Sequence, residues 1–315
     1  MNLPHIHLLL NHFPIIGTII ATGLLLFALL GRSDDLKRGS LVILAGIALL
    51  SIPTYMSGSG AALALKKLPG ISPTALAAHN GTALLALAFI ELTGLFAWLA
   101  LWQSRRFAHP RGWTTGIVVL LAVLTIYFMA LTGNTGGEIR HPEILSRQEA
   151  AAAAAHPVNS SLIDAEAVGM FVTGTKWMWP TCETLHFIGL SLLLGVVFLV
   201  DLRMLGVMKN VSFATLHRLL PWGILGFGLN VLTGIMFFVG APEQYANSLP
   251  FQWKMIFVLI AGANALYFTM FDEVWILKAG DDAPLVAKFA AGSAVVLWVA
   301  VMWCGNMLPF IGDSF

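Results

Sequence analysis

Eight apolar segments of membrane-spanning length constrain the fold of this chain more than any other feature. The segments run over approximately residues 8–30, 39–62, 79–102, 113–133, 180–202, 214–240, 252–277 and 284–308. A helix of about 20 apolar residues crosses the hydrocarbon core of a bilayer. The chain is 58% hydrophobic and only 10% charged, with a mean hydropathy of +0.83. These values exclude a water-soluble globule and predict an all-α, polytopic integral membrane protein.

One long connection divides the eight segments into two groups of four. It covers residues 143–178 and contains an alanine run, Ala150–Ala155, that predicts a short surface helix. We therefore expect two four-helix membrane bundles, residues 1–142 and 179–315, joined by a linker outside the bilayer.

The placement of basic residues predicts the orientation in the membrane. Most of the 17 lysine and arginine residues lie in or beside the connections 31–38, 103–112, 203–213 and 278–288. Basic connections stay on the cytoplasmic side, so both termini and the long linker are expected to be periplasmic. The first segment has neither a preceding basic region nor a small-residue cleavage site, which favours a retained span over a signal peptide.

Five of the nine histidines fall at the same predicted side of the membrane, at the ends of apolar segments. They are His7, His12, His79, His141 and His186. Imidazole near a bilayer is costly unless it binds something, so a shared ligand is the leading hypothesis. The alternative is that these amphipathic side chains simply end the spans and form hydrogen bonds with loops.

Bis-histidine haem ligation between neighbouring helices is the functional interpretation of this cluster. His12 and His79 form the best-matched pair, and His7 with His141 would make a second, shallower site. His7 and His12 lie about 7.5 Å and roughly 140° apart on an unbroken helix, so both cannot face one ligand. His186 is the candidate ligand of the C-terminal half.

Two further groups of polar residues lie within the predicted spans or at their ends. Glu91 is the sole carboxylate deep inside a segment, so it is a candidate proton acceptor for quinone chemistry. Its alternative role is a neutral carboxyl that forms a hydrogen bond with Thr93 or with another helix. His109 and His217 lie among arginines, and we expect both to contact lipid headgroups.

Copper is the main alternative to haem. Cys182 and His186 are four residues apart and share a helix face, and Cys304 is predicted at similar depth. Sulfur together with imidazole is a ligand set that copper prefers. The chain has only two cysteines, which exclude a disulfide framework and leave one disulfide or two buried thiols as the choices.

The N-terminal half resembles an uncharacterised family of small four-span bacterial membrane proteins. The matching motifs are HLLLNHFPIIG (His7–Gly17), AHNG (Ala78–Gly81) and TGNTGGEIRH (Thr132–His141). The resemblance covers about residues 5–142 and places the family's histidines at His7, His12, His79 and His141. Leu8 stands where the family usually has proline, and Gly17 replaces a small apolar residue.

The C-terminal half, residues 180–308, resembles a second uncharacterised bacterial membrane family. The matching motifs are ETLHFIGL (Glu183–Leu190), VDLRMLG (Val200–Gly206) and LLPW (Leu219–Trp222). Together the two resemblances imply a bacterial inner-membrane protein of the b-type cytochrome kind, and they imply no particular substrate.

Membrane electron transfer is the function that these observations favour. One or two b-type haems near the periplasmic face would exchange electrons between the quinone pool and a periplasmic cytochrome or dehydrogenase subunit. The protein would act as a subunit within the lipid bilayer, in a larger membrane complex, and no nucleic acid partner is expected. A copper-binding or copper-transporting protein and a cofactor-free structural subunit of a respiratory complex are the alternatives.

Overall fold

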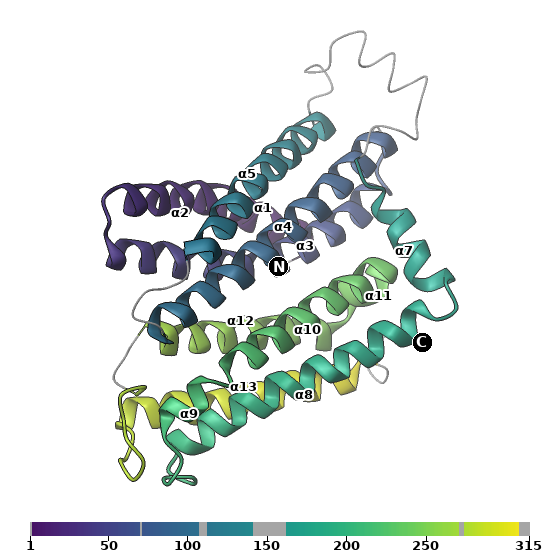
Figure 1. Ribbon diagram of the computed structural model, residues 1–315. Coiled ribbons are helices and arrows are strands. Elements are labelled where there is room, and N and C mark those ends of the chain that lie inside the picture. Colours follow the sequence, from purple (N-terminus) through teal and green to yellow (C-terminus); the bar gives the residue numbers. More distant parts are fainter. Residues whose placement is uncertain (1, 70, 107–111, 141–161, 271–273, 309–315) are drawn as a thin grey trace.

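In the computed structural model every secondary-structure element is a helix over the described residues, which are 2–69, 71–106, 112–140, 162–270 and 274–308. Eight helical segments are long and apolar enough to cross a membrane, and no strand occurs in the described ranges. The long helices lie side by side (Figure 1). The predicted all-α fold with eight candidate spans is therefore confirmed.

The N-terminal half forms a closed ring of four long helices. Its elements are α1 (Leu3–Leu10), α2 (His12–Leu30), α3 (Asp34–Leu65), α4 (Pro73–Arg106) and α5 (Gly112–Arg140). α2 packs against α3 and α5, α3 packs against α4, and α4 packs against α5. Leu25, Leu44, Ile90 and Val118 are fully buried between them. The short α1 lies against α3.

The C-terminal half packs onto this ring. Its elements are α7 (Ala165–Gly174), α8 (Met178–Met204), α9 (Phe213–His217), α10 (Leu220–Gly240), α11 (Pro242–Asn247), α12 (Leu249–Met270) and α13 (Leu285–Met307). α8 packs against α10 and α13, and α12 packs against α13. α12 also contacts α3, and α10 contacts α4, so these two helices join the halves.

Glycines allow α8 and α10 to lie very close together. A Cβ atom added at Gly226 would lie 2.6 Å from the carbonyl oxygen of Gly189, and one at Gly189 would lie 2.9 Å from the carbonyl oxygen of Gly226. Small residues at such crossings bring backbones into van der Waals contact, which drives helix association in lipid.

The first candidate span is broken into α1 and α2 at Asn11. Pro14 lies four residues after Leu10 and has no N–H, so it cannot donate to the carbonyl of Leu10. Asn11 is a turn residue, and α2 begins at His12. The interruption thus lies beside His12, just before the proline.

Several helix ends differ from the hydropathy prediction. α4 begins at Pro73, six residues before the predicted span. α12 ends at Met270, and residues 274–276 form a turn, although the seventh apolar segment extends to residue 277. The predicted surface helix Ala150–Ala155 lies outside the described residues, whereas the linker's α7 was not predicted.

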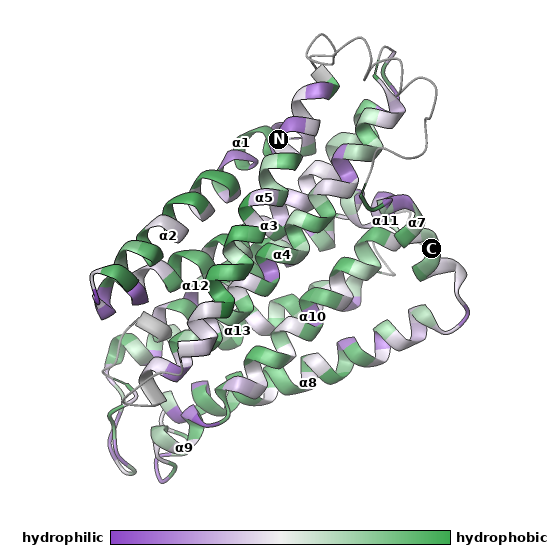
Figure 2. Cartoon of the chain, turned by 45° about the horizontal axis from the view of Figure 1, so that its top comes forward, coloured by the Kyte–Doolittle hydropathy of each residue, from purple (hydrophilic) through white to green (hydrophobic). Residues whose placement is uncertain are grey.

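Large apolar side chains cover the outside of the bundle, as a lipid-facing surface requires. Phe27, Leu120 and Phe289 are 68%, 60% and 82% exposed, and hydrophobic residues follow the long helices throughout (Figure 2). We call the end with Leu65, Pro73 and Gly240 the histidine end. The opposite end, with Asp34 and Met204, is the basic end.

Candidate functional site

His7 is held by a backbone carbonyl of a neighbouring helix. Its Nδ1 lies 3.0 Å from the carbonyl oxygen of Thr54 in α3. A carbonyl oxygen only accepts hydrogen bonds, so the proton of the neutral ring is on Nδ1. The Nε2 lone pair is then available to a ligand, as in histidines that bind metals.

His79 is held in the same way between α4 and α5. Its Nδ1 lies 3.1 Å from the carbonyl oxygen of Thr132, and the hydroxyl of Thr135 lies 3.4 Å from the same nitrogen. His7 and His79 therefore share one tautomer. Both form hydrogen bonds with helix backbone, whereas the sequence interpretation without a ligand expected bonds with loops.

The helix segments that accept these bonds share a short sequence pattern, Thr-x-x-Ser/Thr-Gly. It occurs in α3 at Thr54–Gly58 and in α5 at Thr132–Gly136. In each segment the hydroxyl of the fourth residue donates to the carbonyl of the first, at 2.9 Å for Ser57 and 3.2 Å for Thr135. Sequence reasoning missed this repeat, which is a readable signal for where the two histidines are held.

The glycine that ends each pattern lies against the histidine ring. A Cβ atom at Gly58 would lie 2.8 Å from Cε1 of His7, and one at Gly136 would lie 3.1 Å from Cε1 of His79. Only glycine lets the imidazoles lie this close to the helix backbone. Both rings are thus fixed by a hydrogen bond at one nitrogen and by contact along one side.

His7 and His79 lie in one half of the molecule at the histidine end. His7 of α1 is held by α3, and His79 of α4 is held by α5. Because α3 and α4 pack against each other in the ring, these two helix pairs are neighbours. Two anchored histidines therefore belong to one local environment.

The pairs predicted from the sequence are not the pair that the structure favours. His12 is exposed at the start of α2, while His7 and His79 are both half-buried. His141 lies outside the described residues, so the predicted pair His7–His141 stays a prediction.

His186 is the third anchored histidine, in the C-terminal half. Its Nδ1 lies 2.8 Å from the hydroxyl oxygen of Thr233. That hydroxyl donates to the carbonyl of Leu229 at 2.7 Å, so it accepts the Nδ1 proton of His186. The ring also meets Phe237 edge-on, with centroids 5.7 Å apart.

The proposed copper ligands do not form a compact set. Cys182 and Cys304 are both buried free thiols. Within the described residues, no group of three or more His, Cys, Asp or Glu side chains is arranged to hold a metal ion.

Glu91 lies on the face of α4 that points toward the C-terminal half. Leu95 and Trp98, four and seven residues further along, contact Gly228 and Phe227 of α10. Oε1 of Glu91 is buried and has no hydrogen-bond partner among the described residues.

The expected alternative bond from Glu91 to Thr93 is not formed. The Thr93 hydroxyl instead donates to the carbonyl of Phe89 at 2.7 Å and contacts the hydroxyl of Thr125 at 3.0 Å. Glu91 is therefore half-buried, and its Oε1 has no partner among the described residues.

His217 corrects an expectation from the sequence. It is only 6% exposed, so it does not contact headgroups. Its ring is stacked on Trp102 and meets Trp275 edge-on, with centroids 6.1 and 5.0 Å away. Trp102 also donates its indole N–H to the carbonyl of His217 at 2.9 Å. His109 lies outside the described residues.

The fold and the site together define a polytopic α-helical membrane protein with anchored histidines at one end of its bundle. Comparisons with known protein families, curated proteins and solved structures gave no match. The function is therefore argued from the site itself.

Proposed function

We propose that the N-terminal half binds one haem b through His7 and His79, and that the protein transfers electrons in the membrane. The observation that carries the proposal is the shared anchoring of the two rings, with Nδ1 bonded to a helix carbonyl and Nε2 left to bind iron. A hydrogen bond from Nδ1 to a carbonyl orients a ligating histidine and raises the basicity of its other nitrogen.

The donor set fits a haem better than a bare metal ion. A haem brings most of the ligands of its iron itself, so His7 and His79 would be enough to hold it. A protein-bound zinc or copper ion needs three or four side chains, and the described residues offer no such group. Gly58 and Gly136 provide the close contact that holds the two ligand rings in fixed orientations.

The bound group would supply reversible one-electron transfer, and the chain's own residues would position it and handle protons. The carbonyls of Thr54 and Thr132 keep the rings in the binding tautomer. Glu91 lies 12 residues past His79, about 18 Å along the helix, and would hold a proton released when a quinol is oxidised. The quinone pool and a periplasmic redox protein are the proposed exchange partners.

We propose a haem site in the N-terminal half alone, because that half has two anchored histidines at the histidine end and the C-terminal half has one. In the C-terminal half, His186 is anchored there, whereas His217 lies at the basic end among tryptophans. His186 therefore stays a candidate for a lone ligand.

Absorption spectra of the purified full-length protein test the proposal. A reduced α-band after dithionite is expected for the wild type and should disappear in His7→Ala and His79→Ala. His12→Ala is the matched control, because its side chain is exposed and should leave the band unchanged. A colourless wild type, or a band that His12→Ala removes as completely as His7→Ala, would overturn the proposal.

A further inference from the structure

A cavity lies between the C-terminal helices near the basic end, far from the anchored histidines. Its volume is about 140 Å³, and residues of α4, α8, α10, α12 and α13 line it. Trp98 is 19 residues beyond His79, about 28 Å along α4. The cavity is thus a separate site from the proposed haem site, and its function does not depend on that proposal.

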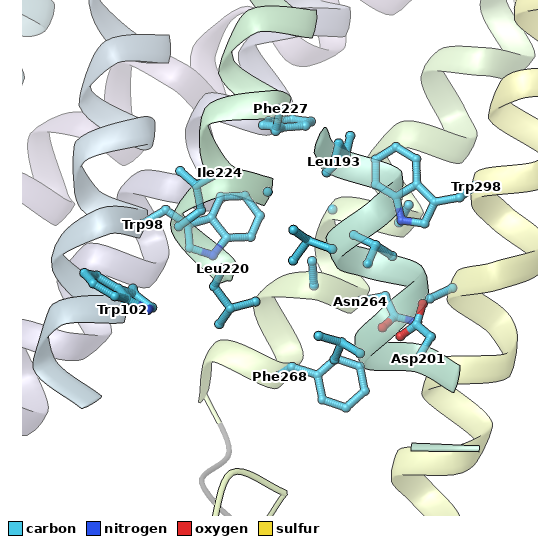
Figure 3. Close-up of a pocket in the computed structure, with 18 of the residues that line it drawn as sticks. Trp98, Trp102, Leu193, Asp201, Leu220, Ile224, Phe227, Asn264, Phe268 and Trp298 are labelled. Atoms are coloured by element: carbon cyan, nitrogen blue, oxygen red, sulfur yellow. The ribbon is translucent and has the colours of Figure 1, made fainter. Parts of the chain in front are cut away.

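Aromatic rings form much of the wall of this cavity. Trp98, Trp102, Phe227, Phe268 and Trp298 all line it, and Figure 3 shows them around the central space. Two of them, Trp98 and Trp102, come from the N-terminal half, so the cavity is complete only when the halves pack together. Aromatic faces attract cations and also bury apolar ligand surface.

Two acceptor oxygens in the cavity have no hydrogen-bond partner. Asp201 is 3% exposed, and its Oδ2 is buried and unpartnered among the described residues. Oδ1 of Asn264 is also buried without a partner, because only the amide nitrogen is bonded, to the carbonyl of Ala290 and the hydroxyl of Ser293. Figure 3 shows Asp201 and Asn264 next to each other beside the cavity.

The nearby guanidinium does not neutralise Asp201. Arg203 is fully buried, but it donates to the carbonyls of Val211, Lys278 and Asp281. Its guanidinium also lies over the ring of Phe213 at 4.5 Å. A buried carboxyl group is costly to ionise without a counter-charge, so a ligand that brings positive charge and hydrogen-bond donors would stabilise its ionised form.

We propose that this cavity binds a lipophilic organic amine, with its ammonium group at Asp201 and Asn264 and its apolar body against the tryptophan and phenylalanine rings. A metal ion is a poor fit because a single carboxylate and an amide oxygen supply too few ligands. A neutral alcohol or phenol would donate a hydrogen bond but would leave the charge of Asp201 unmatched.

Equilibrium binding to the full-length protein in lipid nanodiscs tests this proposal. The probes are 2-phenylethylamine, which is charged at neutral pH, and 2-phenylethanol, which has a similar shape and no charge. Empty nanodiscs correct for partitioning into lipid. We expect saturable binding of the amine and at least tenfold weaker binding of the alcohol.

Three variants separate the contributions of charge and space. Asp201→Asn keeps the shape and removes the charge, so amine binding should weaken at least tenfold. Val197→Phe fills part of the cavity and keeps the carboxylate, and it should also weaken binding. Asp35→Asn changes an exposed aspartate at the same end and should bind like the wild type.

Any one of three results would overturn the proposal. They are equal affinity for amine and alcohol, unchanged amine affinity in Asp201→Asn, and no saturable binding to the wild type. The comparison of the two probes uses the wild type alone, so it remains decisive where a variant fails to fold.

Discussion

The ring of His7 lies directly against Gly58, such that a methyl group at position 58 would come within 2.8 Å of the ring's Cε1 atom. Gly58→Ala must therefore displace the imidazole from the Thr54 carbonyl. Overpacking of this kind costs about 1–3 kcal/mol. We expect Gly58→Ala to lower thermal stability and to reduce the haem content measured by the reduced α-band.

The helix that holds His79 offers a parallel substitution and a matched control. Gly136→Ala should act like Gly58→Ala but more weakly, because its added methyl group would lie 3.1 Å from the ring. Gly133, three residues earlier in the same helix, has no atom within 4 Å of an added Cβ. Equal haem loss in Gly133→Ala and Gly136→Ala would argue against ring displacement as the cause.

Arg203 is predicted to hold the connections at the basic end together. It is fully buried, and its three hydrogen bonds tie the end of α8 to two separate loops. Hydrogen bonds to a charged group contribute about 1.5–3 kcal/mol each, so Arg203→Ala should destabilise the protein by at least that amount. Arg218 is exposed, and Arg218→Ala should change the melting temperature little.

The hydropathy pattern alone predicts the eight spans, because lipid forces every long apolar segment to satisfy its backbone within a helix. It fails at the helix ends. α4 begins at Pro73, six residues before the predicted span, and α12 ends at Met270, seven residues before the predicted end. These ends depend on local capping and on neighbouring helices, which a composition window does not contain.

The candidate site was only partly predictable for a related reason. The sequence indicates that histidines gather at one end of the bundle, but it does not indicate their direction. His7 is half-buried and His12 is exposed, and the carbonyl partners Thr54 and Thr132 lie 47 and 53 residues from their histidines. The cavity at Asp201 needs five helices, so no local pattern predicts it.

We predict that the contribution of Asp282 to folding stability depends on pH. This residue lies outside the membrane-spanning segments. The hydrogen bond from Lys288, at 2.7 Å, and the nearby Lys209 lower the pKa of this exposed carboxyl. A lowered folded-state pKa means that the contribution to stability is full above the ordinary pKa of aspartate and disappears as the pH falls through the lowered value.

Melting temperatures between neutral and acidic pH check this prediction. The difference between wild type and Asp282→Asn should be small, because the pair is exposed to solvent, and it should shrink as the carboxyl becomes protonated. Asp35→Asn serves as a control, since Asp35 is an exposed aspartate elsewhere at the basic end. A difference that grows toward acidic pH would contradict the assigned sign.

We predict that replacing the carboxyl group of Asp201 stabilises the ligand-free protein. Its Oδ2 is buried without a partner, and an unsatisfied buried polar group costs about 1–3 kcal/mol. Asp201→Leu replaces the carboxyl by apolar surface of similar size among apolar neighbours, so the melting temperature should rise. Cys182 and Cys304 are buried free thiols, so a thiol-reactive fluorophore reports unfolding directly.

The Asp201→Leu variant should also lose the stabilisation that 2-phenylethylamine gives the wild type, since a ligand stabilises only the protein that binds it. A lower melting temperature for ligand-free Asp201→Leu would mean that this carboxyl already has a structural partner, whereas a rise accompanied by lost amine stabilisation is the expected pair of results.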